Sequence, residues 1–208
     1  MFRFKDRCIW LSSLLLACAI CPADGVSLSR QELLTNLRHG GYVILMRHAS
    51  SPREIPDAAH INADNKNNER QLDDEGIRSA QTMGNALRHL GIPIGEVLSS
   101  PTYRALQTVK FAQLGQATTF SELGDGGQSM QADNSGARAA WLKARVATVP
   151  VQGANTIIVT HYPNIREAFA QSAADLADGE ALILKPDGRG AAPVVTRMKI
   201  AEWATLDR

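Results

Sequence analysis

The sequence has no cysteine beyond residue 21, since Cys8, Cys18 and Cys21 are its only three. A chain cut after residue 23 would therefore have no disulfide, no thiolate zinc cluster and no cysteine nucleophile. The sequence also has no basic stripe or arm, so nucleic-acid binding has no electrostatic support. With 22 basic and 21 acidic residues in 208, any affinity for an anion has to come from a local site.

The first 23 residues have the layout of a secretory signal peptide. A basic start is followed by an apolar run over residues 8–20, which is short for a membrane span, and then by small residues and Pro22. We expect cleavage after Ala23, which leaves a mature domain over residues 24–208. The expected location of that domain is the periplasm or the outside of the cell.

An alternative processing site lies inside the same segment. The run Leu15-Leu16-Ala17-Cys18 resembles a lipoprotein box, in which Cys18 would become the lipidated first residue. We favour the soluble product because Leu16 fits such a box poorly. Membrane association is expected only if Cys18 is lipidated.

Apolar, β-branched runs alternate with amphipathic segments along the rest of the chain. Strands are predicted over 42–46, 96–99, 117–120, 156–160, 181–184 and 193–198. Helices are predicted over 29–39, 74–90, 135–146 and 163–171, with another after Pro101. The last two strands can pair as a hairpin. This order predicts a three-layer α/β/α sandwich with a mostly parallel central sheet.

Reactive side chains follow the predicted strands directly. Arg47 and His48 follow the first strand, Arg104 lies in the first helical turn after the second, Glu122 follows the third, and His161 ends the fourth. The C-terminal ends of parallel strands lie along one edge of a sheet, where α/β folds bind ligands. We therefore expect these five side chains to converge.

The expected cluster has the chemistry of a phosphoryl-binding site. Arginines offer forked, permanently charged donors to phosphoryl oxygens, and a helix N-terminus near Pro101 also favours anions. An imidazole can act as nucleophile, and a carboxylic acid can protonate a leaving alkoxide. We expect no cofactor and no metal, because side chains supply the positive charge. The sequence has no P-loop and no Gly-x-Ser-x-Gly elbow.

The same residues carry a resemblance to the histidine phosphatase (phosphoglycerate mutase-like) superfamily. The matching segments are Leu45-Met46-Arg47-His48-Ala49, Glu69-Arg70-Gln71-Leu72 with Gly76 and Ala80, Ser99-Ser100-Pro101-Thr102-Tyr103-Arg104-Ala105-Leu106-Gln107-Thr108, Thr160-His161, Gly179-Glu180-Ala181 and Pro186-Asp187-Gly188. They occur in the family's order over residues 42–198. The resemblance implies a phosphoglycerate mutase-like fold.

The resemblance also implies roles for the converging residues. His48 would accept the phosphoryl group as a phosphohistidine, which water then hydrolyses. Arg47, Arg104 and His161 would hold the phosphoryl oxygens. Glu122 stands where many members keep their proton donor, and Asp125 is a second candidate for that role.

Three further residues are candidates for substrate binding. Arg70 can contact the phosphate or anchor the long loop through a salt bridge, and Ser100 can bond in the site or cap the following helix. Asn164 follows His161 in a segment where the family often has glycines, so we expect it near the substrate. Glu69 is predicted to be a solvated loop residue.

The predicted function is that of an exported, metal-independent phosphomonoesterase acting through His48. Its expected substrate is a phosphorylated small molecule or a phosphorylated envelope glycolipid. Two alternatives remain: a non-catalytic module of the same fold that binds phosphate-bearing ligands, and a phosphohistidine protein phosphatase.

Overall fold

A computed structural model of the chain describes residues 28–125 and 136–208. The predicted signal peptide, its three cysteines and the expected helix start at Ser135 lie outside the described residues. Within the two described ranges, no helix has the length and apolar character needed to cross a membrane.

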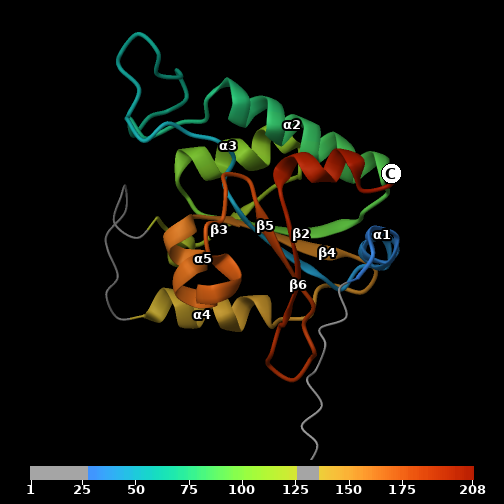
Figure 1. The fold of residues 1–208 in the computed structure, drawn as a ribbon. Helices are drawn as coiled ribbons and strands as arrows, with labels where there is room; N and C mark the ends of the chain where they lie inside the picture. The colour runs from blue at the N-terminus through green and yellow to red at the C-terminus, as the bar shows by residue number, and fades with distance from the viewer. Residues whose placement is uncertain (1–27, 126–135) are drawn as a thin grey trace, which may run out of the picture.

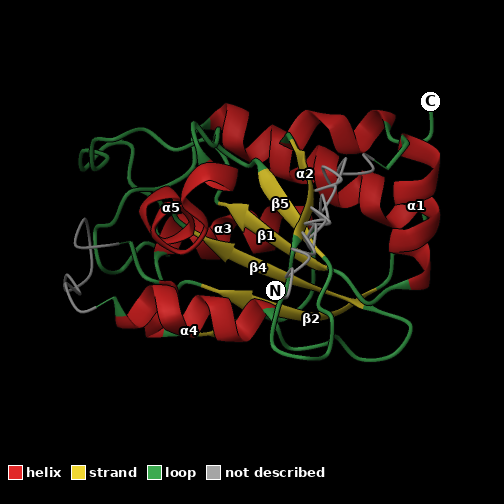
Figure 2. Ribbon diagram, turned by 60° about the horizontal axis from the view of Figure 1, so that its bottom comes forward, coloured by secondary structure: helices red, strands yellow, loops and turns green. Residues whose placement is uncertain are grey.

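Six strands form one sheet in the order β3-β2-β4-β1-β5-β6. Their bounds are β1 Val43–Arg47, β2 Ile94–Ser99, β3 Thr118–Thr119, β4 Asn155–Thr160, β5 Ala181–Leu184 and β6 Val194–Met198. The strands β3, β2, β4 and β1 run parallel, and β5 and β6 continue the sheet as an antiparallel hairpin. Figure 2 shows β5, β1, β4 and β2 side by side. The predicted mostly parallel sheet and C-terminal hairpin are confirmed.

Helices cover both faces of this sheet (Figure 1). The α-helices are α1 Arg30–His39, α2 Asp74–His89, α3 Tyr103–Ala112, α4 Ala137–Val146 and α5 Tyr162–Phe169, and the 3-10 helices are η1 Ser121–Leu123, η2 Ala170–Ala173 and η3 Ile200–Thr205. One core joins the sheet to α1, α2, α3 and η3, and the other joins it to α4 and α5. The expected three-layer α/β/α sandwich, phosphoglycerate mutase-like in its arrangement, is the observed fold.

Strand β1 shows why an uninterrupted run of apolar residues is typical of a central strand. Ile44 and Met46 point into one core and Val43 and Leu45 into the other, and all four are almost completely buried. Because successive side chains alternate between two covered faces, a central parallel strand needs apolar residues at every position. His48, which follows this strand directly, is therefore attached to a rigid, buried segment of backbone.

Two predicted elements are shorter than expected. The third strand covers only Thr118–Thr119, because this edge strand pairs with β2 at two positions before the chain turns into η1. The helix predicted to reach residue 171 ends at Phe169 and continues as η2, after a backbone break at Ala170, where φ is 18° and ψ is −89°. The first helix begins with a capping box formed by Ser29 and Glu32.

Candidate active site

A cavity of about 1150 Å³ opens at the C-terminal ends of β1 and β4. Its polar and charged lining consists of Arg47, His48, Ser51, Arg53, Asn67, Asn68, Glu69, Arg70, His161, Tyr162, Asp175 and Asp178. Arg47 and His48 come directly from β1, and His161 directly follows β4. The register of β1 against β4 pairs Arg47 with Thr160, so the two histidines leave adjacent strands at the same height.

The ring of His48 is held in one tautomer by its own backbone. Its Nδ1 lies 2.8 Å from the carbonyl oxygen of Ala49, and because a carbonyl only accepts, Nδ1 carries the proton. The opposite nitrogen, Nε2, accepts from the Nε of Arg104 at 3.3 Å. Burial, together with the positive charges of Arg104 and Arg47, lowers the pKa of His48 to about 3. The ring is therefore a neutral imidazole with a lone pair on Nε2.

Arg104 occupies the first turn of α3 and is completely buried. Besides donating to His48, its Nη2 lies 3.2 Å from Nδ1 of His161 and 3.1 Å from Oδ2 of Asp125. Asp125 is also completely buried. The guanidinium is therefore fixed between the two histidines and one carboxylate, behind the cavity wall.

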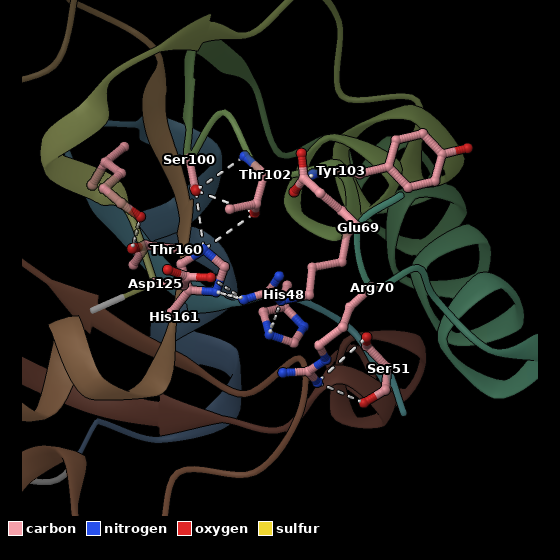
Figure 3. A network of polar contacts seen from close by, with 12 residues as sticks. His48, Ser51, Glu69, Arg70, Ser100, Thr102, Tyr103, Asp125, Thr160 and His161 are labelled. Atoms are coloured by element: carbon pink, nitrogen blue, oxygen red, sulfur yellow. Dashed lines mark hydrogen bonds and ion pairs between the residues drawn. The ribbon is translucent and has the colours of Figure 1, made fainter. Parts of the chain in front are cut away.

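His161 is held from the opposite side by two hydroxyl groups. Its Nε2 lies 3.0 Å from the Oγ of Ser100 and 3.2 Å from the Oγ1 of Thr102 (Figure 3). Because Nδ1 accepts from Arg104, the ring proton resides on Nε2 and is donated to these hydroxyls. Burial, followed by the charges of His48 and Arg104, lowers the pKa of His161 well below its usual value. The two histidine rings meet edge to face, with centroids 5.2 Å apart.

Arg47 is held by the segment that leads into β5. Its Nη2 lies 2.5 Å from the Oδ1 of Asp178, and its Nη1 donates to the carbonyl of Leu176 at 3.0 Å. The amide of Gly179 donates to the carbonyl of His48 at 2.9 Å, which ties the same segment to the neighbouring residue. Sequence reasoning missed Asp178. Its position directly before the quoted Gly179-Glu180-Ala181 motif was the available signal.

Arg70 both anchors the long loop and lines the cavity. Its Nε donates to the carbonyl of Pro52 at 2.6 Å, and its Nη2 donates to the carbonyl of Ser51 at 2.9 Å (Figure 3). The expected loop anchor is thus made through carbonyl groups. Burial lowers the pKa of Arg70, and the nearby charge of Arg104 adds to this effect. Arg70 therefore adds a further cation close to the cavity.

The prediction that Glu69 is a solvated loop residue is wrong. Glu69 is partly buried and lines the cavity, and its Oε2 accepts from the backbone amide of Tyr103 at 2.9 Å. Tyr103 is the first residue of α3, whose N-terminal amides need acceptors. Glu69 thus fixes the long loop to the helix that carries Arg104.

The other predicted residues lie behind or beside the cavity. Ser100 is fully buried behind His161, and its Oγ also accepts from the amide of Thr102 at 3.3 Å. Asn164 is buried and donates to the carbonyl of Glu122 at 3.0 Å and to the Oγ1 of Thr160 at 3.1 Å. The Glu122 carboxylate accepts from the Oγ of Ser121 at 3.1 Å. Neither Asn164 nor Glu122 lines the cavity, and their assigned roles stay predictions.

No group of three or more histidine, cysteine or acidic side chains within residues 28–125 and 136–208 could hold a metal ion. The positive charge at the cavity comes from arginine side chains. A neutral imidazole with an unprotonated nitrogen, set among arginines at the C-terminal edge of a parallel sheet, defines a site suited to a phosphoryl group.

One family model matches part of the chain. Residues 43–124 match the model of the histidine phosphatase superfamily (branch 1). This stretch contains β1, the Arg47-His48 pair, the loop with Arg70 and the helix with Arg104. The matched stretch, which covers less than half of the chain, is thus similar to the histidine phosphatase superfamily. No curated protein sequence matches the chain.

Solved structures share the fold at low sequence identity. The protein histidine phosphatase SixA, solved with tungstate, superposes with a TM-score of 0.55 at 20% identity over 77% of this chain and 98% of that chain. A phosphoserine phosphatase from Entamoeba histolytica, solved with phosphoserine, has a TM-score of 0.50 at 12% identity over 76% of this chain and 97% of that chain. At these identities the likeness concerns the fold.

Proposed function

We propose that the protein is a phosphomonoesterase that hydrolyses phosphate esters through a phosphohistidine on His48. The observation that carries this proposal is the neutral His48 ring, whose Nε2 holds a lone pair at a cavity lined by Arg47 and Arg70. A neutral imidazole is nucleophilic without first losing a proton. The match of residues 43–124 to the histidine phosphatase superfamily model supports the same chemistry.

In the first half-reaction, Nε2 of His48 attacks phosphorus, the ester P–O bond breaks and the alcohol leaves. Arg47, Arg104 and Arg70 stabilise the charge on the phosphoryl oxygens. In the second half-reaction, water attacks phosphorus, the P–N bond breaks and phosphate leaves. The arginines already stand in place, so little reorganisation is needed as charge develops.

His161 takes up a proton when the anion binds. In the empty site its Nδ1 accepts from Arg104, and burial opposes a charge on the ring. A phosphate dianion beside the ring favours the imidazolium, because an opposite charge at short range raises the pKa of an imidazole. The protonated Nδ1 then donates to a phosphoryl oxygen, which gives His161 its role in holding the transferred group.

The proposed setting is outside the cytoplasm, after cleavage behind Ala23. The basic start and short apolar run of the first 23 residues support export. The substrate proposed for that setting is a small phosphorylated molecule or a phosphorylated envelope glycolipid. Cell fractionation of a full-length chain carrying a C-terminal tag, with N-terminal sequencing of the mature product, tests both export and the cleavage site.

The test of the chemistry compares wild type with His48→Asn on para-nitrophenyl phosphate in the presence of EDTA. We expect EDTA-resistant turnover that the substitution abolishes. Wild type quenched in base should carry a phosphoryl group that is labile to acid and stable to base, as expected for phosphohistidine. Folded wild type that binds phosphate yet releases none from any ester would instead support a non-catalytic binding module.

A phosphohistidine protein phosphatase is the second candidate. The shared fold with SixA, which extends over 98% of that chain, favours it. A phosphohistidine substrate loses an imidazole, a better leaving group than an alkoxide. Turnover of a phosphohistidine-bearing protein with much higher kcat/KM than any phosphate ester would favour this candidate.

A further inference from the structure

An alkyl phosphate releases a strongly basic alkoxide, so its hydrolysis needs a proton donor at the cavity. Among residues 28–125 and 136–208, five carboxyl groups lie in or next to the site: Glu69, Glu122, Asp125, Asp175 and Asp178. The requirements are access to the cavity, closeness to the phosphoryl site and an environment that favours the protonated form. These three requirements separate the five groups.

Two of the groups do not reach the cavity. Asp125 has no exposed side-chain surface and is held by Arg104 at 3.1 Å. Glu122 does not line the cavity, and its carboxylate accepts from Ser121 in the same turn. Neither is placed to meet a leaving group.

Glu69 and Asp175 line the cavity but lack the other properties. Both oxygens of Glu69 are acceptors, Oε2 from the Tyr103 amide at 2.9 Å and Oε1 from Asn67 at 3.4 Å. The carboxylate of Glu69 is therefore already engaged by the chain itself. Asp175 is solvent-exposed on the rim.

Asp178 meets all three requirements. It lines the cavity, its side chain is 35% exposed, and its Oδ1 lies 2.5 Å from the Nη2 of Arg47. The next residue, Gly179, donates to the carbonyl of His48 at 2.9 Å, so the backbone holds Asp178 beside the nucleophile. From these contacts we propose that Asp178 is the proton donor to the leaving alkoxide, and that the preferred substrates are phosphate esters of aliphatic alcohols.

The surroundings of Asp178 agree with this assignment. Burial raises the pKa of its carboxyl group, although Arg47 and Arg70 act in the opposite direction, and the charge of Asp73 raises it too. The protonated form is therefore more populated than in a solvated aspartate. A phosphate dianion on Arg47 adds a negative charge that raises the pKa further.

The protons balance over the two half-reactions. As His48 attacks and the P–O bond breaks, the Asp178 proton moves to the leaving oxygen, which departs as an alcohol. The resulting carboxylate takes a proton from the water that attacks the phosphohistidine, and the P–N bond breaks. Phosphate leaves with Asp178 protonated and His48 neutral again.

This assignment rests on the proposed ester hydrolysis. The dependence of kcat/KM on the basicity of the leaving group tests the role of Asp178 separately from the hydrolysis itself. The substrates are para-nitrophenyl phosphate, phenyl phosphate and glycerol 3-phosphate, in order of increasing leaving-group basicity. For Asp178→Asn we expect kcat/KM to fall about 100-fold or more on glycerol 3-phosphate and less than about tenfold on para-nitrophenyl phosphate. Inhibition by inorganic phosphate should not weaken, because Arg47 keeps its place.

Asp175→Asn is the matched control, since it removes the same charge from the same rim. It should change kcat/KM by the same small factor on all three esters. Thermal melting verifies folding, and Asp178→Ser serves as a second variant should Asp178→Asn not fold. An equal loss on all esters, with weaker phosphate inhibition, would show that Asp178 only positions Arg47 and would overturn the assignment, while ester hydrolysis stands. A wild type without turnover on any ester would overturn both.

Discussion

Arg104 and Asp125 form an ion pair at 3.1 Å in which neither side chain is exposed. Removing two charges from water carries a large desolvation cost, which their mutual attraction offsets only while both partners are present. The same guanidinium also contacts Nε2 of His48 and Nδ1 of His161. Asp125 therefore fixes the arginine that contacts both histidine rings.

Asp125→Asn should destabilise the fold and reduce turnover together. The substitution leaves the buried Arg104 charge without its carboxylate, and breaking a buried pair in this way costs about 3–5 kcal/mol. Urea unfolding gives the free energy, and kcat/KM on para-nitrophenyl phosphate gives the activity. The exposed Asp207→Asn serves as control and should stay within about 0.5 kcal/mol of wild type. A stable, fully active Asp125→Asn would contradict the role of this pair.

Stability should fall as the pH decreases from about 6.5. The pKa of His48 is about 3 in the folded state, so between these values the unfolded chain binds a proton that the folded chain does not. Unfolding is then favoured at lower pH by an amount on the order of a few kcal/mol. His161 acts in the same direction.

His48→Asn removes one of these two groups and should make the dependence of unfolding free energy on pH shallower. Urea denaturation at pH 7, 6, 5 and 4 measures the effect for both proteins. His60→Asn, at an exposed position on the long loop, provides the control. An unchanged slope in His48→Asn would show that His48 is not held neutral by the fold.

Anion binding should be coupled to proton uptake. Sulfate carries a fixed charge near neutral pH, so any proton exchanged on binding belongs to the protein. The neutral His161 ring lines the cavity while its Nδ1 accepts from Arg104, and a bound anion raises its pKa. Sulfate affinity should therefore increase as the pH falls from 8 to 6.

Isothermal titration calorimetry in buffers of different ionisation enthalpy measures the proton count directly. We expect an uptake that disappears in His161→Gln, which cannot become charged. Sulfate binding without proton exchange in the wild type would mean that His161 stays neutral in the complex.

Gly76 should not tolerate a side chain. A Cβ at this position would lie 2.1 Å from the carbonyl oxygen of Ser50, two residues after His48. Alanine favours a helix over glycine by about 1 kcal/mol, but the contact with rigid backbone outweighs this gain. Gly76→Ala should lose about 1–3 kcal/mol in urea unfolding and lower kcat, because the loop that follows His48 must shift.

Gln81→Ala lies on the exposed side of the same helix and is the matched control. It should leave unfolding free energy and kcat close to those of wild type. Equal effects of the two substitutions would mean that α2 can move away from Ser50 at little cost.

The parts of the site that follow strands could be predicted from the sequence. A buried parallel strand has an apolar run that is easily recognised, and its last residue fixes the edge of the sheet, so Arg47, His48 and His161 were predicted to converge. The cavity is lined by all three. Arg104 was placed at the start of a helix by the preceding proline, and it contacts both histidines.

Residues on irregular segments could not be placed in the same way. Glu69 looked like a solvated residue because its partner, the Tyr103 amide, is 34 positions away and gives no periodic signal. Asp178 contacts Arg47 across 131 positions, from a segment without a regular repeat. The neighbours of such residues depend on the course of the loop through space. That course cannot be read from the residue types in the loop.

The bond between the His48 ring and the carbonyl of Ala49 is confined to two adjacent residues. Many hydrolases aim their imidazole with a third side chain from elsewhere in the chain, but here the nucleophile carries its own alignment. Distant substitutions can then reshape the rim for new substrates while the reactive nitrogen keeps its direction. The surrounding loops could then be exchanged or varied while Nε2 of His48 keeps the orientation needed for attack.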